Sequence, residues 1–181
     1  MSNRYYLGSV AIKEAALEGP FLPDANVWLF LYGPVQDHRS WQAKAYSAFF
    51  ADALKRGAAF YLPQIIATEF VNRSLTLLAE TSGWNRKTDG KLHAHRDYPF
   101  WAKDACDSLH AFVSDVSRVA DRFDEIDLEA LYDEVENGGR LDFNDHLIAN
   151  MCRSLGMTLI THDADFSGMD LPIITANKKL T

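Results

Sequence analysis

Short β-rich segments alternate with longer amphipathic segments along most of the chain, and this alternation constrains the fold more than any other feature. Segments typical of short buried strands end at Asp24 and Pro63, and two more lie near the carboxyl end. These two occupy residues 157–161 and 171–175. The segments between them place apolar residues at helical spacing over residues 40–56, 65–80 and 142–155. Such alternation predicts a three-layer α/β/α fold with a central parallel sheet.

Start and stop residues mark the ends of several helices. Gly57 follows residues 40–56, while Asp142 is placed to cap the helix that ends before Gly156. The apolar run after Asp24 fits a strand or a helix, because its period does not separate the two. We also expect a helix over about 99–121, a weak strand over 122–127 and a helix over 128–135.

Length and composition favour one domain. The 181 residues are 48% hydrophobic, which is enough for one substantial core. We expect residues 1–19 to be an N-terminal extension and the polar stretch 81–97 to be a long loop or insertion. Residues 1–19 lack the apolar run of a signal peptide, and no apolar run in the sequence is long enough to span a membrane. Neither Cys106 nor Cys152 belongs to a CxxC pair. A cytoplasmic protein is therefore expected.

Acidic side chains follow the predicted strands or lie near the starts of helices. Asp24 and Asp163 come directly after predicted strands, so they should lie at the carboxyl edge, where open α/β sheets bind ligands. Asp145 lies in the first turn of its helix and Glu69 about a turn and a half into another. We expect these four carboxylates to converge.

Convergence of four carboxylates needs a compensating charge, because their mutual repulsion in a partly desolvated cleft is severe. Hard divalent cations prefer oxygen ligands, so Mg²⁺ or Mn²⁺ is the expected cofactor, with Asp142 and Asp165 as possible auxiliary ligands. Bound cations of this kind support phosphodiester hydrolysis. The net charge of −7 counts against a nucleic-acid substrate, but a carboxylate site supplies much of it.

The order PDANVWL, then IIATEF, then DFNDHLIANMCRSLGMTLITHDADF resembles the PIN-domain ribonucleases, especially the VapC-like toxins, over about residues 20–175. The resemblance implies a Mg²⁺- or Mn²⁺-dependent endoribonuclease with an RNA substrate. It also implies a homodimer and, for a toxin, an antitoxin partner. The family's four acids match Asp24, Glu69, Asp145 and Asp163.

Two polar residues are expected to support the four acids. The family's frequent serine or threonine after the first acid is Ala25 here, so we expect Asn26 to supply a polar contact to metal-bound water. Thr161 opens the Thr-x-Asp turn that carries Asp163. The extra length of the chain weakens the toxin assignment more than the nuclease assignment.

Each acid also has a purely structural interpretation. Asp24 and Asp165 could be ordinary turn residues. Glu69 could be a solvated acid that pairs with Arg73 four residues on. Asp142 is first of all a helix cap, and capping alone would also explain Asp145.

Other sites and functions have weaker support. Zinc binding could use His93, His95, Cys106 and His110, although these look like ordinary loop and helix residues. His146 and His162 neighbour the acids and are expected to be surface or RNA-contacting residues. A basic strip with interleaved tryptophans could bind single-stranded RNA through Arg73, Arg86, Lys87, Lys91, Arg96, Trp84 and Trp101.

Four further classes remain as alternatives or lose their support. GxSxG, GxGxxG and Walker lysine motifs are absent from the sequence, which removes the main support for serine hydrolases and nucleotide-binding folds. A phosphohydrolase with Asp24 as nucleophile would lack the usual Asp-x-Asp, because Asn26 occupies the second position. The alternative of a different class is a non-catalytic PIN-like module that binds RNA or protein.

Overall fold

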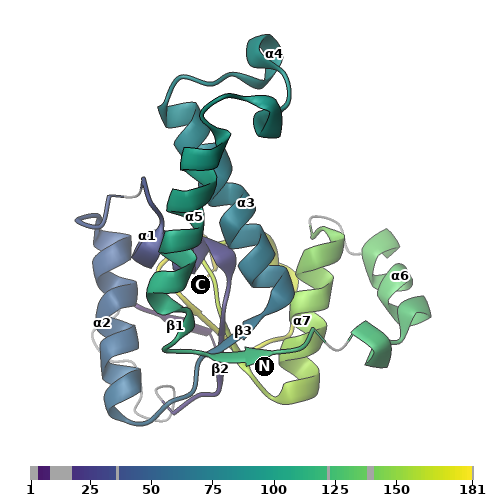
Figure 1. Ribbon diagram of the computed structural model, residues 1–181. Coiled ribbons are helices and arrows are strands. Elements are labelled where there is room, and N and C mark those ends of the chain that lie inside the picture. The colour runs from purple at the N-terminus through teal and green to yellow at the C-terminus, as the bar shows by residue number, and fades with distance from the viewer. Residues whose placement is uncertain (1–3, 9–17, 36, 122, 138–140, 181) are drawn as a thin grey trace.

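The computed structural model describes residues 4–8, 18–35, 37–121, 123–137 and 141–180. The fold is α/β, with helices predominating, and every strand pairing in the described residues is parallel (Figure 1). The expected α/β class and parallel sheet are therefore confirmed.

The main sheet has four short strands in the order β1-β6-β5-β2. They are β1 (Arg4–Tyr6), β6 (Ile173–Thr175), β5 (Thr158–Ile160) and β2 (Phe21–Pro23). A second parallel pair joins β3 (Tyr61–Pro63) to β4 (Ser117–Val119), and a bridge between Phe21 and Phe60 places this pair beside β2. The main sheet is a buried layer, because its central residues are inaccessible to solvent, among them Leu22, Leu159, Ile173 and Ile174.

Seven α-helices surround these strands in the described part of the chain. They are α1 (Ala25–Tyr32), α2 (Trp41–Lys55), α3 (Gln64–Thr81), α4 (Arg86–Asp89), α5 (Tyr98–Val113), α6 (Leu128–Asn137) and α7 (Phe143–Leu155). The helices predicted over 40–56, 65–80, 128–135 and 142–155 are thus confirmed. Short 3₁₀ segments lie at η2 (Leu92–Ala94), η3 (Phe123–Glu125), η4 (Ala164–Gly168) and η5 (Lys178–Leu180).

The apolar run after Asp24 forms a buried helix rather than a continuing strand. The Asp24 side chain accepts a hydrogen bond from the Ala25 N–H and so caps α1. Trp28 is 1% exposed and stacks on Phe112 of α5 with ring centroids 4.3 Å apart. This packing explains why the run is apolar around nearly its whole circumference and shows no clear period.

The segment after residue 113 differs from the prediction. The helix expected over about 99–121 ends at Val113, and residues 117–119 form β4. The Ser117 N–H donates to the Phe60 carbonyl at 2.8 Å, so pairing with β3 replaces the last helical turns. The weak strand expected over 122–127 was wrong, because η3 occupies residues 123–125 of that stretch.

The two segments expected to lie outside the regular fold both contain regular structure. Within the N-terminal extension, Arg4–Tyr6 pairs with β6, while residues 9–17 lie outside the described residues. The stretch 81–97 contains α4 and η2 at the far ends of α3 and α5, which project together from the sheet (Figure 1). A small apolar cluster around Leu75, Ala79, Trp101 and Ala105 holds this projection together, so it is not a structureless loop.

Candidate functional site

Two of the expected acids meet at the carboxyl ends of neighbouring parallel strands. Asp24 directly follows β2, and Asp163 comes three residues after the end of β5, which pairs with β2. The Asp24 N–H donates to the Ile160 carbonyl at 2.9 Å, so the loop after β2 is tied to the end of β5. The predicted location of Asp24 and Asp163 at this sheet edge is confirmed.

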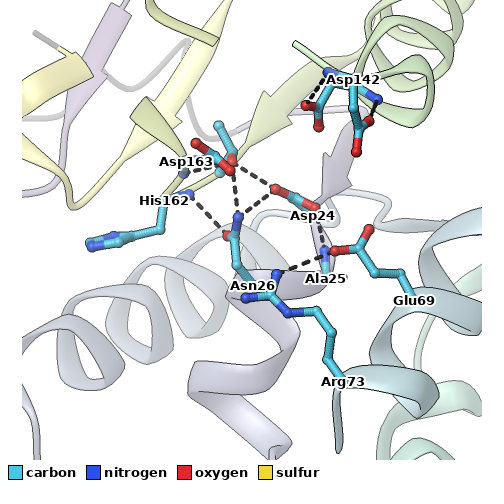
Figure 2. A network of polar contacts seen from close by, with 10 residues as sticks. Asp24, Ala25, Asn26, Glu69, Arg73, Asp142, His162 and Asp163 are labelled. Atoms are coloured by element: carbon cyan, nitrogen blue, oxygen red, sulfur yellow. Dashed lines mark hydrogen bonds and ion pairs between the residues drawn. The ribbon is translucent and has the colours of Figure 1, made fainter. Parts of the chain in front are cut away.

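The Asp24 carboxylate is buried and held by three donors. One oxygen accepts from the Ala25 N–H at 2.6 Å, and the other accepts from the Thr161 hydroxyl at 2.8 Å and the Asn26 side-chain amide at 2.5 Å (Figure 2). Asp24 itself is 5% exposed. These contacts fix the orientation of the carboxylate, which is the supporting geometry expected around Asn26 and Thr161.

Asn26 and Thr161 also hold the loop that carries Asp163. The His162 N–H donates to the Asn26 side-chain oxygen at 3.0 Å, and the Asp163 N–H donates to the Thr161 hydroxyl at 3.0 Å (Figure 2). Asp163 in turn accepts the Asp165 N–H at 2.9 Å and caps η4. The polar network therefore positions both Asp24 and Asp163. The Asp165 N–H stabilises the turn that begins at Asp163.

One further residue of this network was not anticipated from the sequence. The Tyr46 hydroxyl on α2 donates to the Thr161 carbonyl at 3.2 Å, lies 3.0 Å from His162 Nδ1 and accepts the Ala176 N–H. Tyr46 is fully buried among apolar residues, so its position in a helical stripe is indistinguishable from that of an ordinary core residue. It braces the loop after β5 from behind.

Asp142 and Asp145 form a reciprocal cap at the start of α7. Asp142 accepts the Asp145 N–H at 3.0 Å, and Asp145 accepts the Asp142 N–H at 3.1 Å. The expected N-cap role of Asp142 is confirmed. The same pair of bonds fixes the orientation of the Asp145 side chain at the start of α7.

Glu69 comes from α3 and is the least firmly held of the four acids. One of its oxygens accepts from the Arg73 guanidinium at 3.2 Å, the i,i+4 pair that its structural interpretation predicts. Its side chain is 30% exposed. Figure 2 shows Glu69 extending toward Asp24 and Ala25 from across the site, so pairing with Arg73 does not turn it away.

Electrostatic coupling shows that the four acids share one region. Burial, with smaller contributions from Glu69 and Asp145, raises the pKa of Asp24 to about 7 even though the Thr161 and Ala25 hydrogen bonds oppose the rise. Burial also raises the pKa of Asp145 to about 6, and Asp142, Asp163 and Glu69 add to this effect. Negative charge is therefore unfavourable at this edge without a cation.

The donor set suits a hard divalent cation in chemistry and charge. All four acids offer carboxylate oxygens, the ligands that Mg²⁺ and Mn²⁺ prefer, and a cation would offset the repulsion that raises these pKa values. In the conformation of the described residues, however, no three His, Cys, Asp or Glu side chains are arranged to hold a metal ion. The acids face a common region without forming a closed ligand shell.

The two histidines next to these acids have structural contacts. His146 is 2% exposed, contrary to the expectation of a surface or RNA-contacting residue, and its Nδ1 lies 3.1 Å from Glu134 of α6. His162 is half-buried against Tyr46, and burial lowers its pKa. The zinc alternative gains no support, since within the described ranges His93, His95, Cys106 and His110 do not belong to any group of three side chains that could hold a metal ion.

Comparison with known proteins shows a likeness in structure alone. No family model matches the chain, and no curated protein matches it. Among solved structures, the fold is similar to that of a chain in the crystal structure of VapBC2 from Rickettsia felis bound to a DNA fragment from their promoter. The TM-score is 0.53 with 14% identity, and the match covers 86% of this chain and 97% of that chain.

At 14% identity the likeness concerns the fold and carries no residue roles. No helix in the described residues is both long and apolar enough to cross a membrane.

Proposed function

We propose that this chain is a Mg²⁺- or Mn²⁺-dependent endoribonuclease with a three-layer PIN-type fold. One observation carries the proposal: the buried carboxylate of Asp24 lies beside Asp163 at the carboxyl end of adjacent parallel strands, with Glu69 and Asp145 opposing its charge. A buried carboxylate with a raised pKa at a ligand-binding sheet edge is typical of functional sites.

The residues of the site divide into those that would hold a cation and those that orient them. Asp24, Asp145 and Asp163 would be the firm ligands, because backbone and side-chain hydrogen bonds fix each of them. Glu69 would join them once its carboxylate releases Arg73, or while it binds both Arg73 and the cation. A bound Mg²⁺ or Mn²⁺ would supply activation of water and stabilisation of the leaving oxygen in phosphodiester hydrolysis.

Thr161 and Asn26 act as positioning residues in this account. Each donates to the Asp24 oxygen Oδ2 and so stabilises the ionised form needed for cation binding. Their remaining bonds hold the backbone of His162 and Asp163, which keeps the second aspartate in register with the first. Asp142 contributes by fixing Asp145, and a ligand role for Asp142 or Asp165 is secondary.

The sequence resemblance supplies the substrate class, and the structural likeness to VapBC2 supports it. We infer an RNA substrate, a homodimer, an antitoxin partner and a cytoplasmic location on these two grounds. The likeness covers most of both chains, so the shared architecture extends beyond the site. Ends with 3′-hydroxyl and 5′-phosphate groups are the products that the resemblance implies.

Cleavage of a labelled RNA pool by the purified chain tests the proposal. Asp24→Asn and Asp145→Asn should each abolish Mg²⁺- or Mn²⁺-dependent cleavage while the circular dichroism spectrum stays unchanged. Asp52→Asn is the matched control, because Asp52 is exposed on α2 and pairs only with Lys55 among the described residues. Full activity in both site variants would refute the assignment.

A second candidate is a non-catalytic module that binds RNA or protein through the same fold. The absence of a closed set of metal ligands in the described residues favours it. Calorimetric titration with Mn²⁺ separates the two candidates. Binding that disappears in Asp24→Asn supports the nuclease, whereas no binding up to millimolar Mn²⁺ supports the module.

A further inference from the structure

The projection formed by α4, η2 and the ends of α3 and α5 contains a pocket of about 430 Å³. We call it the arm pocket. Its polar lining comes from Thr76 and Glu80 of α3 and from the stretch after it, which contributes Trp84, Arg86, Lys91 and His93. Its volume falls within the usual range for small-ligand sites. The pocket lies at the carboxyl-terminal end of α3, whereas Glu69 of the acidic site lies nearer the start of this helix.

The cationic side chains of the arm pocket are available to a ligand. Among the described residues, neither Arg86 nor Lys91 has a carboxylate partner. Asp89, the acid nearest to them in sequence, accepts from the Asn85 N–H at 2.7 Å and the Thr88 hydroxyl at 3.0 Å. These two hydrogen bonds engage the Asp89 carboxylate locally, so it does not pair with Arg86 or Lys91. Two cationic side chains without a carboxylate partner among the described residues thus line this pocket, although the net charge of the chain is −7.

Trp84 gives the pocket a second recognition element. Its indole N–H is buried and has no hydrogen-bond partner among the described residues. The neighbouring Trp101 differs, because its indole N–H donates to the Ser82 hydroxyl at 3.2 Å and its ring stacks on His95. Buried donors without acceptors are rare in folded proteins, so this indole N–H requires an explanation, and Trp84 is also one of the residues that line the pocket.

We propose that the arm pocket binds one nucleotide of single-stranded RNA, away from the acidic site. Arg86 and Lys91 would contact the phosphodiester, and Trp84 would contact the base through its ring or its indole N–H. Glu80 and Thr76 offer acceptors to a base amino group. A nucleotide offers an anionic phosphate to Arg86 and Lys91 and a base amino group to Glu80, whereas an acidic side chain offers only an anionic group to this mixed lining. This assignment rests on the proposed ribonuclease function.

The length of α3 sets the RNA length that could use both sites. Glu69 and Glu80 are eleven residues apart on this helix, and a rise of 1.5 Å per residue separates them by about 16 Å along its axis. At about 3.4 Å per stacked nucleotide, this distance corresponds to roughly five nucleotides. An RNA of about five or more nucleotides could therefore occupy both sites at once, whereas a trinucleotide could occupy only one of them.

Fluorescence anisotropy with a 5′-labelled, unstructured 20-nucleotide RNA tests the arm pocket. Binding is measured in EDTA to prevent cleavage, at several salt concentrations. The variant Arg86→Gln/Lys91→Gln should bind at least tenfold more weakly, and the slope of log K against log salt should fall by about 0.7, because the two side chains together neutralise one phosphate. Trp84→Phe keeps the ring, removes the N–H and should weaken binding severalfold.

Matched controls separate this pocket from general charge and folding effects. Lys44→Gln/Lys55→Gln removes two exposed cations from α2, and Trp41→Phe alters an exposed tryptophan there. Both should bind RNA as the wild type does, and thermal melting by circular dichroism should show that all variants are folded.

The proposed nucleotide site would be refuted by unchanged RNA affinity and an unchanged salt slope in the Arg86/Lys91 variant. An equal loss of RNA affinity in the Lys44/Lys55 control would refute it as well. Competition by polyglutamate as strong as that by poly(U) would also overturn a nucleotide site in favour of a general anion site. RNA binding that depends on the arm, with no cleavage by the wild type in Mn²⁺, would refute the nuclease and leave the arm pocket standing.

Discussion

Replacing Asp24 with Asn should stabilise the metal-free protein at neutral and alkaline pH, because the native carboxylate is held where its charge is unfavourable. Burial raises the pKa of Asp24 from 3.8 to about 7. Between these two values the folded state binds more protons than the unfolded state, so the free energy of unfolding falls as the pH rises. The contribution of Asp24 to the free energy of unfolding is fully present below pH 3.8 and is lost as the pH rises through about 7.

The size of the effect follows from the shift and from the hydrogen bonds lost in the variant. A shift of this size corresponds to about 4 kcal/mol at pH 8 and about 1 to 2 kcal/mol at pH 5. The amide that replaces the carboxylate would no longer accept from both Thr161 and Asn26, which costs about 1 kcal/mol per bond. We therefore expect the two proteins to be about equally stable at pH 5 and the variant to be about 2 kcal/mol more stable at pH 8.

Urea denaturation of both proteins in EDTA at pH 5 and pH 8 measures this difference. The Asp52→Asn variant is the control, because it alters an exposed acid outside the site. A difference in unfolding free energy between wild type and Asp24→Asn that does not change with pH would refute the reasoning. That result would mean that Asp24 ionises as an ordinary carboxylate.

Three further predictions follow from the same contacts. Mn²⁺ at 100 times its dissociation constant should stabilise the wild type by about 2.7 kcal/mol and leave Asp24→Asn unchanged in thermal melts; equal stabilisation of both would place the ion elsewhere. Thr161→Val should reduce Mn²⁺-dependent cleavage and require more Mn²⁺ for half-maximal rate, because it removes a donor that stabilises ionised Asp24; an unchanged Mn²⁺ requirement would contradict its positioning role. Asp142→Ala should lower the unfolding free energy by about 1 kcal/mol, because it removes the cap of α7, and a loss below about 0.3 kcal/mol in urea would contradict the capping role.

The elements nearest to the site were the easiest to predict from the sequence. Asp24 and Asp163 follow short β-rich runs, and the parallel arrangement brings the ends of such runs to one edge. Asp142 and Gly156 bound α7 as expected, because capping depends on residues only a few positions apart. Local signals were sufficient wherever a residue and its partner lie close in the sequence.

Features that depend on distant partners were not predictable in this way. The β4 strand forms because residues 117–119 pair with residues 61–63, and nothing in the local pattern of apolar residues marks that pairing. Tyr46 reads as a core residue, yet its hydroxyl contacts segments more than 100 residues away. The raised pKa of Asp24 likewise results from burial by the assembled fold and not from its neighbours in the chain.

Anomalous diffraction from crystals soaked in Mn²⁺ would locate the proposed cation. We expect an anomalous peak among the carboxylates of Asp24, Asp145 and Asp163, with Glu69 drawn toward it and away from Arg73. Crystals of Asp24→Asn soaked in the same way should lack the peak. An empty acidic site in wild-type crystals, from protein that still cleaves RNA in Mn²⁺, would contradict the account.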